Sequence, residues 1–162
     1  WTENARTVLT QFEPLAEIVR KELRRLSPVR FPIQPCLRDI WADHVLFTGN
    51  DVTGLIDPTA CRSDNVAVDL ARLLGSFLGD DEPRWHEALR MYHERRPLSE
   101  SERELVRALD RSNILLSAMT WLDRYFLSQV TIPHPAAALK RLAMYAERIV
   151  HLAKSAHRMI AP

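Results

Sequence analysis

Apolar residues recur at intervals of three and four positions along most of this 162-residue chain. That spacing places them on one face of an α-helix, so it predicts a mainly helical protein. The predicted helical faces fall in residues 2–26, 66–77, 82–95, 105–126 and 142–156. A chain of this length is about one domain and can bury one substantial core. We therefore expect a single domain over residues 1–162.

Several residues mark where these helices begin, bend or end. Pro14 predicts a kink or restart in the first helix, and the prolines of residues 27–35 predict a connector with no strand interior. Ser63 or Asp64 can cap the helix that Gly79 ends. Further on, Ser99 and Glu102 have capping-box spacing, and residues 112–113 suggest a break in the long helix that follows.

One stretch departs from the helical pattern. Residues 45–47 and 52–56 are rich in residues that favour strands, and they flank Gly49, Asn50 and Asp51, which tolerate positive φ. The pattern predicts one small β-hairpin. Together with the helices it predicts a mainly α (α+β) fold.

Composition excludes several classes of partner. The 22 basic and 21 acidic residues leave a formal charge of +1, too small to recruit nucleic acid or an acidic membrane surface. No apolar run is long enough for a transmembrane helix, and the first residues do not form a signal peptide. We expect a soluble, cytoplasmic protein. Cys36 and Cys61 are too few for a disulfide framework, so we expect both thiols to be reduced and buried.

Two aspartates flank the predicted hairpin. Asp39 precedes it and Asp57 follows it, 18 positions later (57 minus 39). A hairpin that folds back would bring both carboxylates to the same end of one element. Magnesium takes oxygen ligands from one or two carboxylates and completes its shell with water and phosphates, while a further carboxylate can accept a hydroxyl proton. The pair therefore indicates phosphoryl transfer, although both aspartates could instead serve only to cap turns.

Three short motifs in this region also resemble a known family. Residues 37–46 (LRDIWADHVL), residues 55–57 (LID) and residues 69–74 (DLARLL) follow the order and spacing of the C-terminal lobe of the aminoglycoside phosphotransferase and choline kinase family. The resemblance implies a helical, kinase-like lobe whose hairpin carries the catalytic and metal loops. It further implies that Asp39 is the catalytic aspartate and that Asp57 binds magnesium. By the same resemblance, Arg38 and Asp69 support the catalytic loop.

The activity that this resemblance implies is ATP- and Mg²⁺-dependent transfer of a γ-phosphate to the hydroxyl of a small molecule. Such chemistry also needs a glycine-rich loop and a strand lysine on the phosphates, and the sequence contains neither. We therefore expect an N-terminal nucleotide-binding lobe outside this chain, and we expect the chain alone to be inactive. The acceptor could be an amino sugar, an amino alcohol, an amino acid or another hydroxylated metabolite.

Position 44 departs from the family pattern. His44 stands where the family has an asparagine that binds a second magnesium ion, and imidazole is a poor ligand for a hard cation. His44 could contact metal or phosphate directly, support the loop through hydrogen bonds, or have no role. In addition, Leu37 replaces the motif histidine, and Pro58 follows Asp57 where many relatives have an aromatic residue.

Two other functions remain open at this stage. One is a non-catalytic helical interaction module that keeps the kinase-like lobe without nucleotide chemistry. The departures at His44 and Pro58 and the missing glycine-rich loop favour it. The other is a transition-metal site built from Asp39, His44 and Asp57, because imidazole suits such metals.

Overall fold

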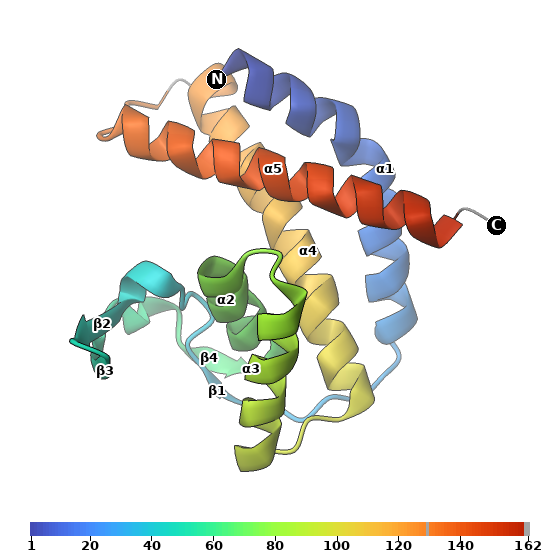
Figure 1. The fold of residues 1–162 in the computed structure, drawn as a ribbon, viewed down its shortest axis with the longest axis vertical. Coiled ribbons are helices and arrows are strands. Elements are labelled where there is room, and N and C mark those ends of the chain that lie inside the picture. The colour runs from blue at the N-terminus through green and yellow to red at the C-terminus, as the bar shows by residue number, and fades with distance from the viewer. Residues whose placement is uncertain (129, 161–162) are drawn as a thin grey trace. The chain divides into compact units, whose positions relative to one another are not determined.

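The computed structural model describes residues 1–128 and 130–160. Its α-helices are α1 (Thr2–Leu26), α2 (Ala67–Leu78), α3 (Glu82–Arg95), α4 (Glu100–Leu122) and α5 (Pro135–Ile160) (Figure 1). Its strands are β1 (Gln34–Cys36), β2 (Val45–Thr48), β3 (Asp51–Leu55) and β4 (Arg62–Asp64). The short helices are η1 (Ala42–His44), η2 (Pro58–Ala60) and η3 (Asp123–Leu127), the last a π-helix. The chain is 69% helical, which confirms the mainly α class.

The chain divides into two compact units. One contains residues 1–23 and 111–162, and the other contains residues 24–110. Each unit has its own cluster of buried apolar side chains. Every site residue predicted from the sequence lies in the unit of residues 24–110.

The core of the first unit forms between α1, the C-terminal part of α4, and α5. Its fully buried side chains include Val8, Ile114, Leu142 and Ile149, one from α1, one from α4 and two from α5. The buried residues of each element repeat at helical spacing, as Val8, Leu15 and Val19 do in α1, which is why the sequence pattern located the helices. Pro14 lies inside α1, which continues through it and changes direction along its length in Figure 1, as a proline within a helix predicts.

The core of the second unit gathers around Trp85 of α3. The indole is 1% exposed, and its Nε1–H donates to the carbonyl of Gly79 at 2.8 Å. A buried indole needs such an acceptor, because its N–H would otherwise lose the hydrogen bond it makes with water. Leu70 of α2 and Val106 of α4 belong to the same cluster. The site described below is therefore attached to a packed helical base.

Two antiparallel ribbons precede α2. β2 pairs with β3, which confirms the predicted hairpin, and Gly49 occupies its turn at φ 62°. β1 pairs with β4 and sets Cys36 opposite Arg62. This second ribbon corrects the prediction that residues 27–35 form only a connector, because β1 includes Pro35. A ribbon of two strands has only edge strands, where a proline can be accommodated.

Two other predictions about the helices, a capping residue and a break, are also wrong. The side chain that accepts from the first N–H of α2 belongs to Asn65, whose Oδ1 contacts the Ala67 N–H at 2.9 Å, while Ser63 and Asp64 lie in β4. The α4 helix runs without a break through residues 112–113. Its irregularity comes later, in the π-helical turn η3. Gly79 does end α2, at φ 55°.

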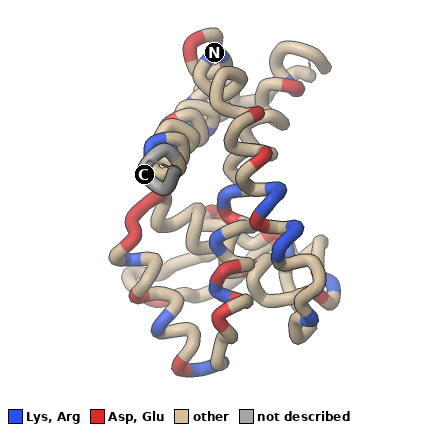
Figure 2. Tube along the Cα trace, turned by 90° about the vertical axis from the view of Figure 1, so that its right-hand side faces the viewer, with Lys and Arg blue, Asp and Glu red and all other residues tan. Residues whose placement is uncertain are grey.

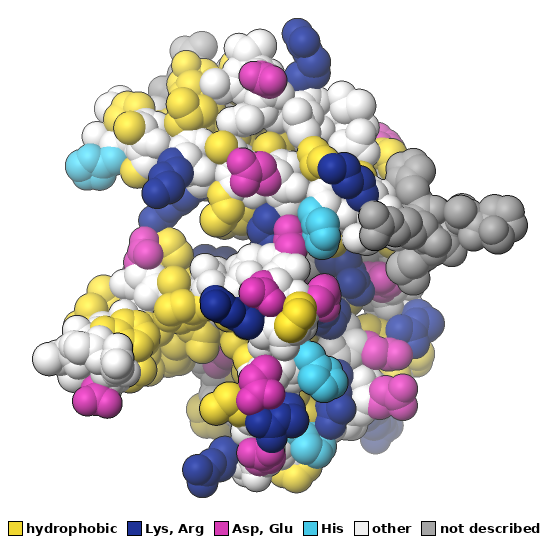
Figure 3. Space-filling view, in the orientation of Figure 1, with side chains coloured by type: hydrophobic (Ala, Val, Ile, Leu, Met, Phe, Trp, Pro, Cys, Tyr) yellow, Lys and Arg dark blue, Asp and Glu magenta, His cyan; other side chains and the backbone are white. Residues whose placement is uncertain are grey.

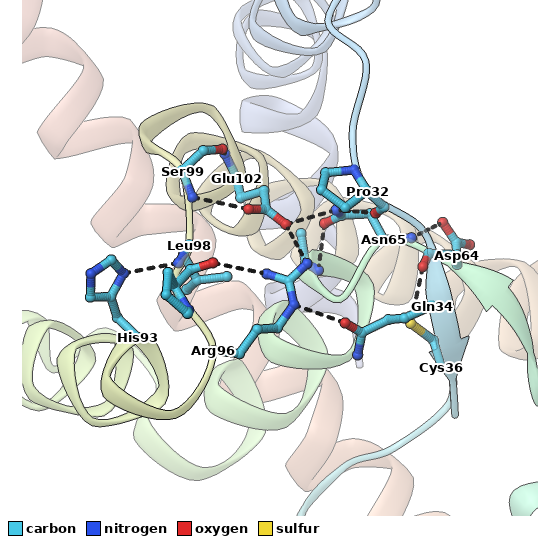
Figure 4. Close-up of polar contacts among 12 residues, drawn as sticks. Pro32, Gln34, Cys36, Asp64, Asn65, His93, Arg96, Leu98, Ser99 and Glu102 are labelled. Atoms are coloured by element: carbon cyan, nitrogen blue, oxygen red, sulfur yellow. Dashed lines mark hydrogen bonds and ion pairs between the residues drawn. The ribbon is translucent and has the colours of Figure 1, made fainter.

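A buried carboxylate anchors the start of α4 (Figure 4). The Glu102 Oε2 accepts from the Ser99 N–H at 2.9 Å, and Ser99 Oγ accepts from the Glu102 N–H at 3.1 Å, which confirms the capping box. The other oxygen, Oε1, accepts from Arg96 at 2.9 Å and from Asn65 at 3.0 Å. Asn65 also donates to the carbonyl of Pro32. Glu102 thus ties together the segment before β1, the start of α2 and the start of α4.

The distribution of charge agrees with the small net charge. Basic and acidic residues are interspersed along the chain in Figure 2, and several form ion pairs one helical turn apart, such as Glu87 with Arg90. Such exposed pairs contribute little stability. Among the described residues, no helix is both long and apolar enough to cross a bilayer.

Apolar side chains gather on the outside of the β2–β3 hairpin, at the lower left of Figure 3. Phe47, Val52 and Leu55 are each at least half exposed. Phe47 also meets Phe77 of α2 edge to face, with ring centroids 6.3 Å apart. The hairpin therefore contacts α2 through one aromatic pair and leaves other apolar side chains in solvent.

The pKa of Glu102 makes the stability of the fold depend on pH. Burial alone would raise this pKa, but hydrogen bonds from Arg96, Ser99 and Asn65 lower it to about 2. Because the folded pKa lies below that of the unfolded chain, Glu102 stabilises the fold above the unfolded value of 4.5. That stability is lost as the pH falls toward 2. The shift corresponds to about 3 kcal/mol.

We predict that Glu102→Gln lowers the free energy of unfolding at pH 7 by about 3 kcal/mol and removes much of the loss of stability between pH 5 and 2. Urea unfolding at a series of pH values measures both effects. Glu100→Gln, an exposed change on the same helix, is the control and should leave the pH profile unchanged. Parallel pH profiles for Glu102→Gln and the unmodified chain would contradict the assignment.

Candidate functional site

The loop that carries Asp39 is held by the backbone of the two residues before it. Asp69, in the first turn of α2, accepts from the Leu37 N–H at 2.9 Å and from the Arg38 N–H at 2.6 Å. Both carboxylate oxygens are used, one for each N–H group. Hydrogen bonds to a charged acceptor contribute about 1.5–3 kcal/mol each, roughly twice the value of neutral ones. Through these two hydrogen bonds Asp69 holds the backbone that leads to Asp39.

Arg38 is held in an unfavourable backbone conformation. Its φ is 66°, in the left-handed region that costs a residue with a Cβ about 1–2 kcal/mol. Asp69 binds its N–H, and Asp64 pairs with its guanidinium at 3.1 Å. These contacts offset the strain. The turn at Arg38 redirects the chain immediately before Asp39.

The Asp39 side chain has a cationic partner on α2. Arg72 forms an ion pair with the Oδ1 of Asp39. Arg72 lies three residues after Asp69, so the two side chains project from the same face of α2. One helix face therefore binds both the backbone of the loop and the carboxylate that the loop presents. Asp39 is half-buried, with 45% of its side chain exposed, so a ligand can still reach it.

Asp57 is also strained, and it lies at the end of the hairpin. Its φ is 56° and its ψ is 59°, and it precedes Pro58, a position where helical conformations are disfavoured. The Thr59 hydroxyl donates to the Asp57 Oδ1 at 2.8 Å. Within the described part of the chain, the other carboxylate oxygen has no hydrogen bond or ion pair, and the residue is exposed. Asp57 therefore presents one oriented oxygen to solvent.

His44 connects these two segments. Its Nδ1 contacts the Asp39 carbonyl oxygen at 2.8 Å, and its Nε2 accepts from the Trp41 Nε1–H at 2.7 Å. Its own carbonyl accepts from the Ile56 N–H at 3.0 Å. Ile56 is the residue before Asp57. A continuous path of hydrogen bonds thus joins the backbone of Asp39 to the strand that leads to Asp57.

Among the residues predicted to bind metal, Asp57 fits magnesium. Its exposed carboxylate is the kind of hard oxygen ligand that magnesium takes singly or in pairs, together with water and phosphate. His44 does not fit, because both of its ring nitrogens are already engaged. Nor do the described residues contain a group of three or more His, Cys, Asp or Glu side chains placed to hold a metal ion. That result contradicts the hypothesis of a transition-metal site at Asp39, His44 and Asp57.

Sequence reasoning missed two side chains that act on the candidate carboxylates. Arg72 carried a signal that could have been used, since it lies one helical turn after Asp69 within the DLAR motif. Thr59 carried only a weak signal, its place two residues after Asp57, to whose Oδ1 its hydroxyl donates.

The two thiols differ in their surroundings. Cys36 is buried and donates to the Asp64 carbonyl at 3.3 Å, whereas Cys61 is exposed. The prediction that both are buried is therefore wrong for Cys61, which follows η2 at the surface. Burial raises the pKa of the Cys36 thiol, and the negative charges of Asp69 and Asp64 raise it further.

We predict that Asp69→Asn releases the loop before Asp39. An amide can accept one of the two backbone N–H groups but cannot accept both equally, and leaving one unpaired costs about 1–3 kcal/mol. Hydrogen exchange at the Leu37 and Arg38 amides should accelerate. Asp51→Asn, at the hairpin turn, should leave that exchange unchanged. Unaltered protection in Asp69→Asn would show that other contacts hold the loop.

The difference between the thiols predicts their reactivity. In the folded chain, Cys61 should react with a thiol-specific aromatic disulfide at the rate of a free thiol, while Cys36 should react only when the chain unfolds. Absorbance at neutral pH, with and without denaturant, measures the two phases. Cys61→Ser should remove the fast phase alone. Two fast equivalents in the folded chain would contradict the burial of Cys36.

Comparison with known proteins identifies the family. Residues 1–109 match the "Phosphotransferase enzyme family". The chain is also similar to a homoserine kinase of Agrobacterium fabrum (strain C58), with 29% identity over 135 residues. That alignment covers 77% of this chain and 39% of the relative, so the chain spans well under half of the length of this kinase.

The family match covers both ribbons, η1, η2, α2, α3 and the start of α4, and therefore every residue of the site described above. The resemblance noted in the LRD, LID and DLAR motifs is thereby confirmed at the level of the family. The chain belongs to the phosphotransferase enzyme family.

Proposed function

We propose that this chain is the C-terminal lobe of an ATP- and Mg²⁺-dependent kinase that transfers the γ-phosphate of ATP to a hydroxyl of a small molecule. In this proposal Asp39 accepts the hydroxyl proton and Asp57 is the cation ligand. Arg38 and Asp69 support the catalytic loop. The acceptor is a hydroxylated metabolite, and the name of the similar kinase makes homoserine the first candidate.

The backbone at the two aspartates carries this proposal. Arg38 and Asp57 are the non-glycine residues with positive φ among the described residues. One directly precedes the proposed base, and the other is the proposed cation ligand. Strain of this kind persists only where surrounding contacts impose it, and it is concentrated at functional sites. Here Asp69, Asp64 and Thr59 supply those contacts.

Each residue then has a defined part in the reaction. The acceptor oxygen forms a bond to the γ-phosphorus while the bond from that phosphorus to the bridging oxygen of ADP breaks. The hydroxyl proton passes to Asp39, which Arg72 holds in one orientation through its Oδ1. Magnesium, when bound at Asp57, would neutralise charge on the nucleotide phosphates.

The remaining parts of the site belong to an N-terminal lobe that supplies a glycine-rich loop and a lysine for the phosphates. The lysines of this chain are Lys21, Lys140 and Lys154, and each lies in α1 or α5. None lies in the unit that contains Asp39 and Asp57. We therefore propose that the chain needs that lobe for nucleotide binding and has little activity alone.

One observation favours the alternative, a non-catalytic interaction module. His44 stands where the family has a metal-binding asparagine, and its ring nitrogens are engaged within the protein. An interaction module would keep the helical base and the apolar hairpin surface while the carboxylates became dispensable. The two functions predict different responses to the loss of Asp39 and Asp57.

Phosphoryl transfer to homoserine distinguishes them. The protein should be produced with whatever residues its gene encodes before Trp1, and γ-phosphate transfer from ATP should be measured with magnesium. We expect Asp39→Asn to lower kcat by about 10²–10⁴-fold. Asp57→Asn should weaken the response to magnesium, and Asp51→Asn should behave as the unmodified protein.

The kinase proposal fails if that protein transfers no phosphate to any of the four acceptor classes and binds ATP equally well with and without Asp57, as measured by calorimetry. Transfer to an amino sugar or amino alcohol in place of homoserine would keep the kinase and change the acceptor.

A further inference from the structure

We infer that His44 is a positioning residue that fixes the Asp39 loop against the Asp57 strand, and that it is not a ligand of the cation. The inference rests on the proposed function in one respect, the assignment of Asp57 as the cation ligand. His44 is one of the residues at which this chain departs from the family pattern. A histidine at this position replaces a side chain that binds metal with one that binds two parts of its own loop.

The hydrogen bonds of the ring fix its protonation state. The Trp41 indole N–H can only donate, so the Nε2 that it contacts must be an unprotonated acceptor. The Asp39 carbonyl oxygen can only accept, so Nδ1 must carry the proton. The imidazole is therefore neutral and protonated on Nδ1. Neither nitrogen has a lone pair free for a metal ion.

Because of its position in the chain, His44 can hold the Asp39 loop and the segment before Asp57 at a fixed distance from each other. It is the last residue of η1, directly before β2. The ring binds the carbonyl of Asp39, five residues earlier, and the backbone carbonyl of His44 binds the N–H of Ile56 in the return segment of the hairpin. One residue thus contacts both segments that carry the candidate carboxylates. An asparagine would keep the main-chain bond to Ile56, but its donor and acceptor lie at one end of a shorter side chain, so it could not bridge Asp39 and Trp41 as the ring does.

A second contact fixes the other end of η1. The Ala42 N–H donates to Ser76 Oγ at 2.9 Å, and Ser76 lies on α2. The same helix holds Leu37 and Arg38 through Asp69. The loop between these points is residues 39–41, and His44 binds within it at Asp39 and at Trp41. Without the His44 ring, this short segment would keep its ends and the ion pair of Asp39 with Arg72, and it would lose the two hydrogen bonds that the ring makes.

For cation binding, this part of the protein therefore offers one ligand, Asp57, where the family pattern has two, an aspartate and an asparagine. Asp57 supplies a carboxylate oxygen, and water and phosphate oxygens complete the shell of a magnesium ion bound in this way. Position 44 binds metal in the family, but in this chain we infer that it holds the loop.

The protonation state can be tested directly in the chain as it stands. Long-range ¹H–¹⁵N NMR at neutral pH should show the His44 ring protonated on Nδ1 and unprotonated on Nε2, and the Trp41 indole N–H should exchange slowly with solvent. Addition of Mg²⁺ or Zn²⁺ should leave the His44 nitrogen shifts unchanged. A shift of either His44 nitrogen that saturates with metal would overturn the inference.

The positioning role needs a second readout that global stability does not move. A nitroxide attached to the exposed Cys61 reports on the Asp39 amide, because the neighbouring Arg62 pairs with Cys36 in the β1–β4 ribbon. In His44→Phe, with retained helical circular dichroism, we expect the broadening of the Asp39 amide to change and the protection of Trp41 to be lost. His86→Phe makes the same substitution on an exposed surface and should change neither.

The outcomes separate this inference from the proposed function. An Asp39 amide that is equally broadened in His44→Phe and the unmodified chain would overturn the positioning role. The tautomer and the broadening do not depend on any metal, so they stand or fall without Asp57. The affinity for Mn²⁺ can be measured in the protein produced with the residues that its gene encodes before Trp1. If Asp57→Asn leaves that affinity unchanged, the assignment of Asp57 as the cation ligand fails, while the positioning role of His44 remains.

Discussion

The arrangement around Asp39 depends on one carboxylate that accepts two successive backbone N–H groups. Asp69 stands in the first turn of α2, a helix packed by Leu70 and its neighbours onto the core of its unit. Its two hydrogen bonds hold Leu37 and Arg38 in a conformation that Arg38 would not adopt alone. The energy that holds the strained loop therefore comes from the packed helix behind it. A loop of this kind is only as well fixed as the helix that bears its acceptor.

The hairpin extends this order to Asp57. Neither β2 nor β3 has a buried residue, so the packing of the ribbon contributes little to its position. Backbone hydrogen bonds set its register, and His44 connects its base to the loop before it. The segments that carry the two carboxylates are thus joined by the His44 ring and by main-chain hydrogen bonds. Exposed side chains on the hairpin can vary without changing that relation.

Sequence periodicity predicted the helices because their buried faces repeat with the period of the helix, as Val8, Leu142 and Ile149 show. It could not predict the β1–β4 ribbon, whose strands have three residues each and include Pro35. The cap of α2 was misplaced because Asp64 and Asn65 are both good capping residues. The pairing of β4 with β1 decides between them, since it extends the chain through Asp64.

For the candidate site, the order and spacing of the motifs single out Asp39, Asp57 and Asp69, and their roles stay predictions. The contacts of those residues depend on backbone dihedral angles, which cannot be predicted from the spacing of residues in the sequence. Thr59 contacts Asp57, which lies in the left-handed region directly before a proline. The sequence likewise leaves the role of His44 open. Whether it binds a metal or supports the loop depends on which atoms its two ring nitrogens contact.

The Asp57–Pro58 pair has an evolutionary consequence. Glycine enters the left-handed region freely, so a glycine at position 57 would relieve the backbone that aspartate strains. Substitution toward greater thermal resistance would therefore tend to erase the acidic group. If homologous sequences keep aspartate at this position, selection retains the carboxylate although the backbone conformation favours glycine.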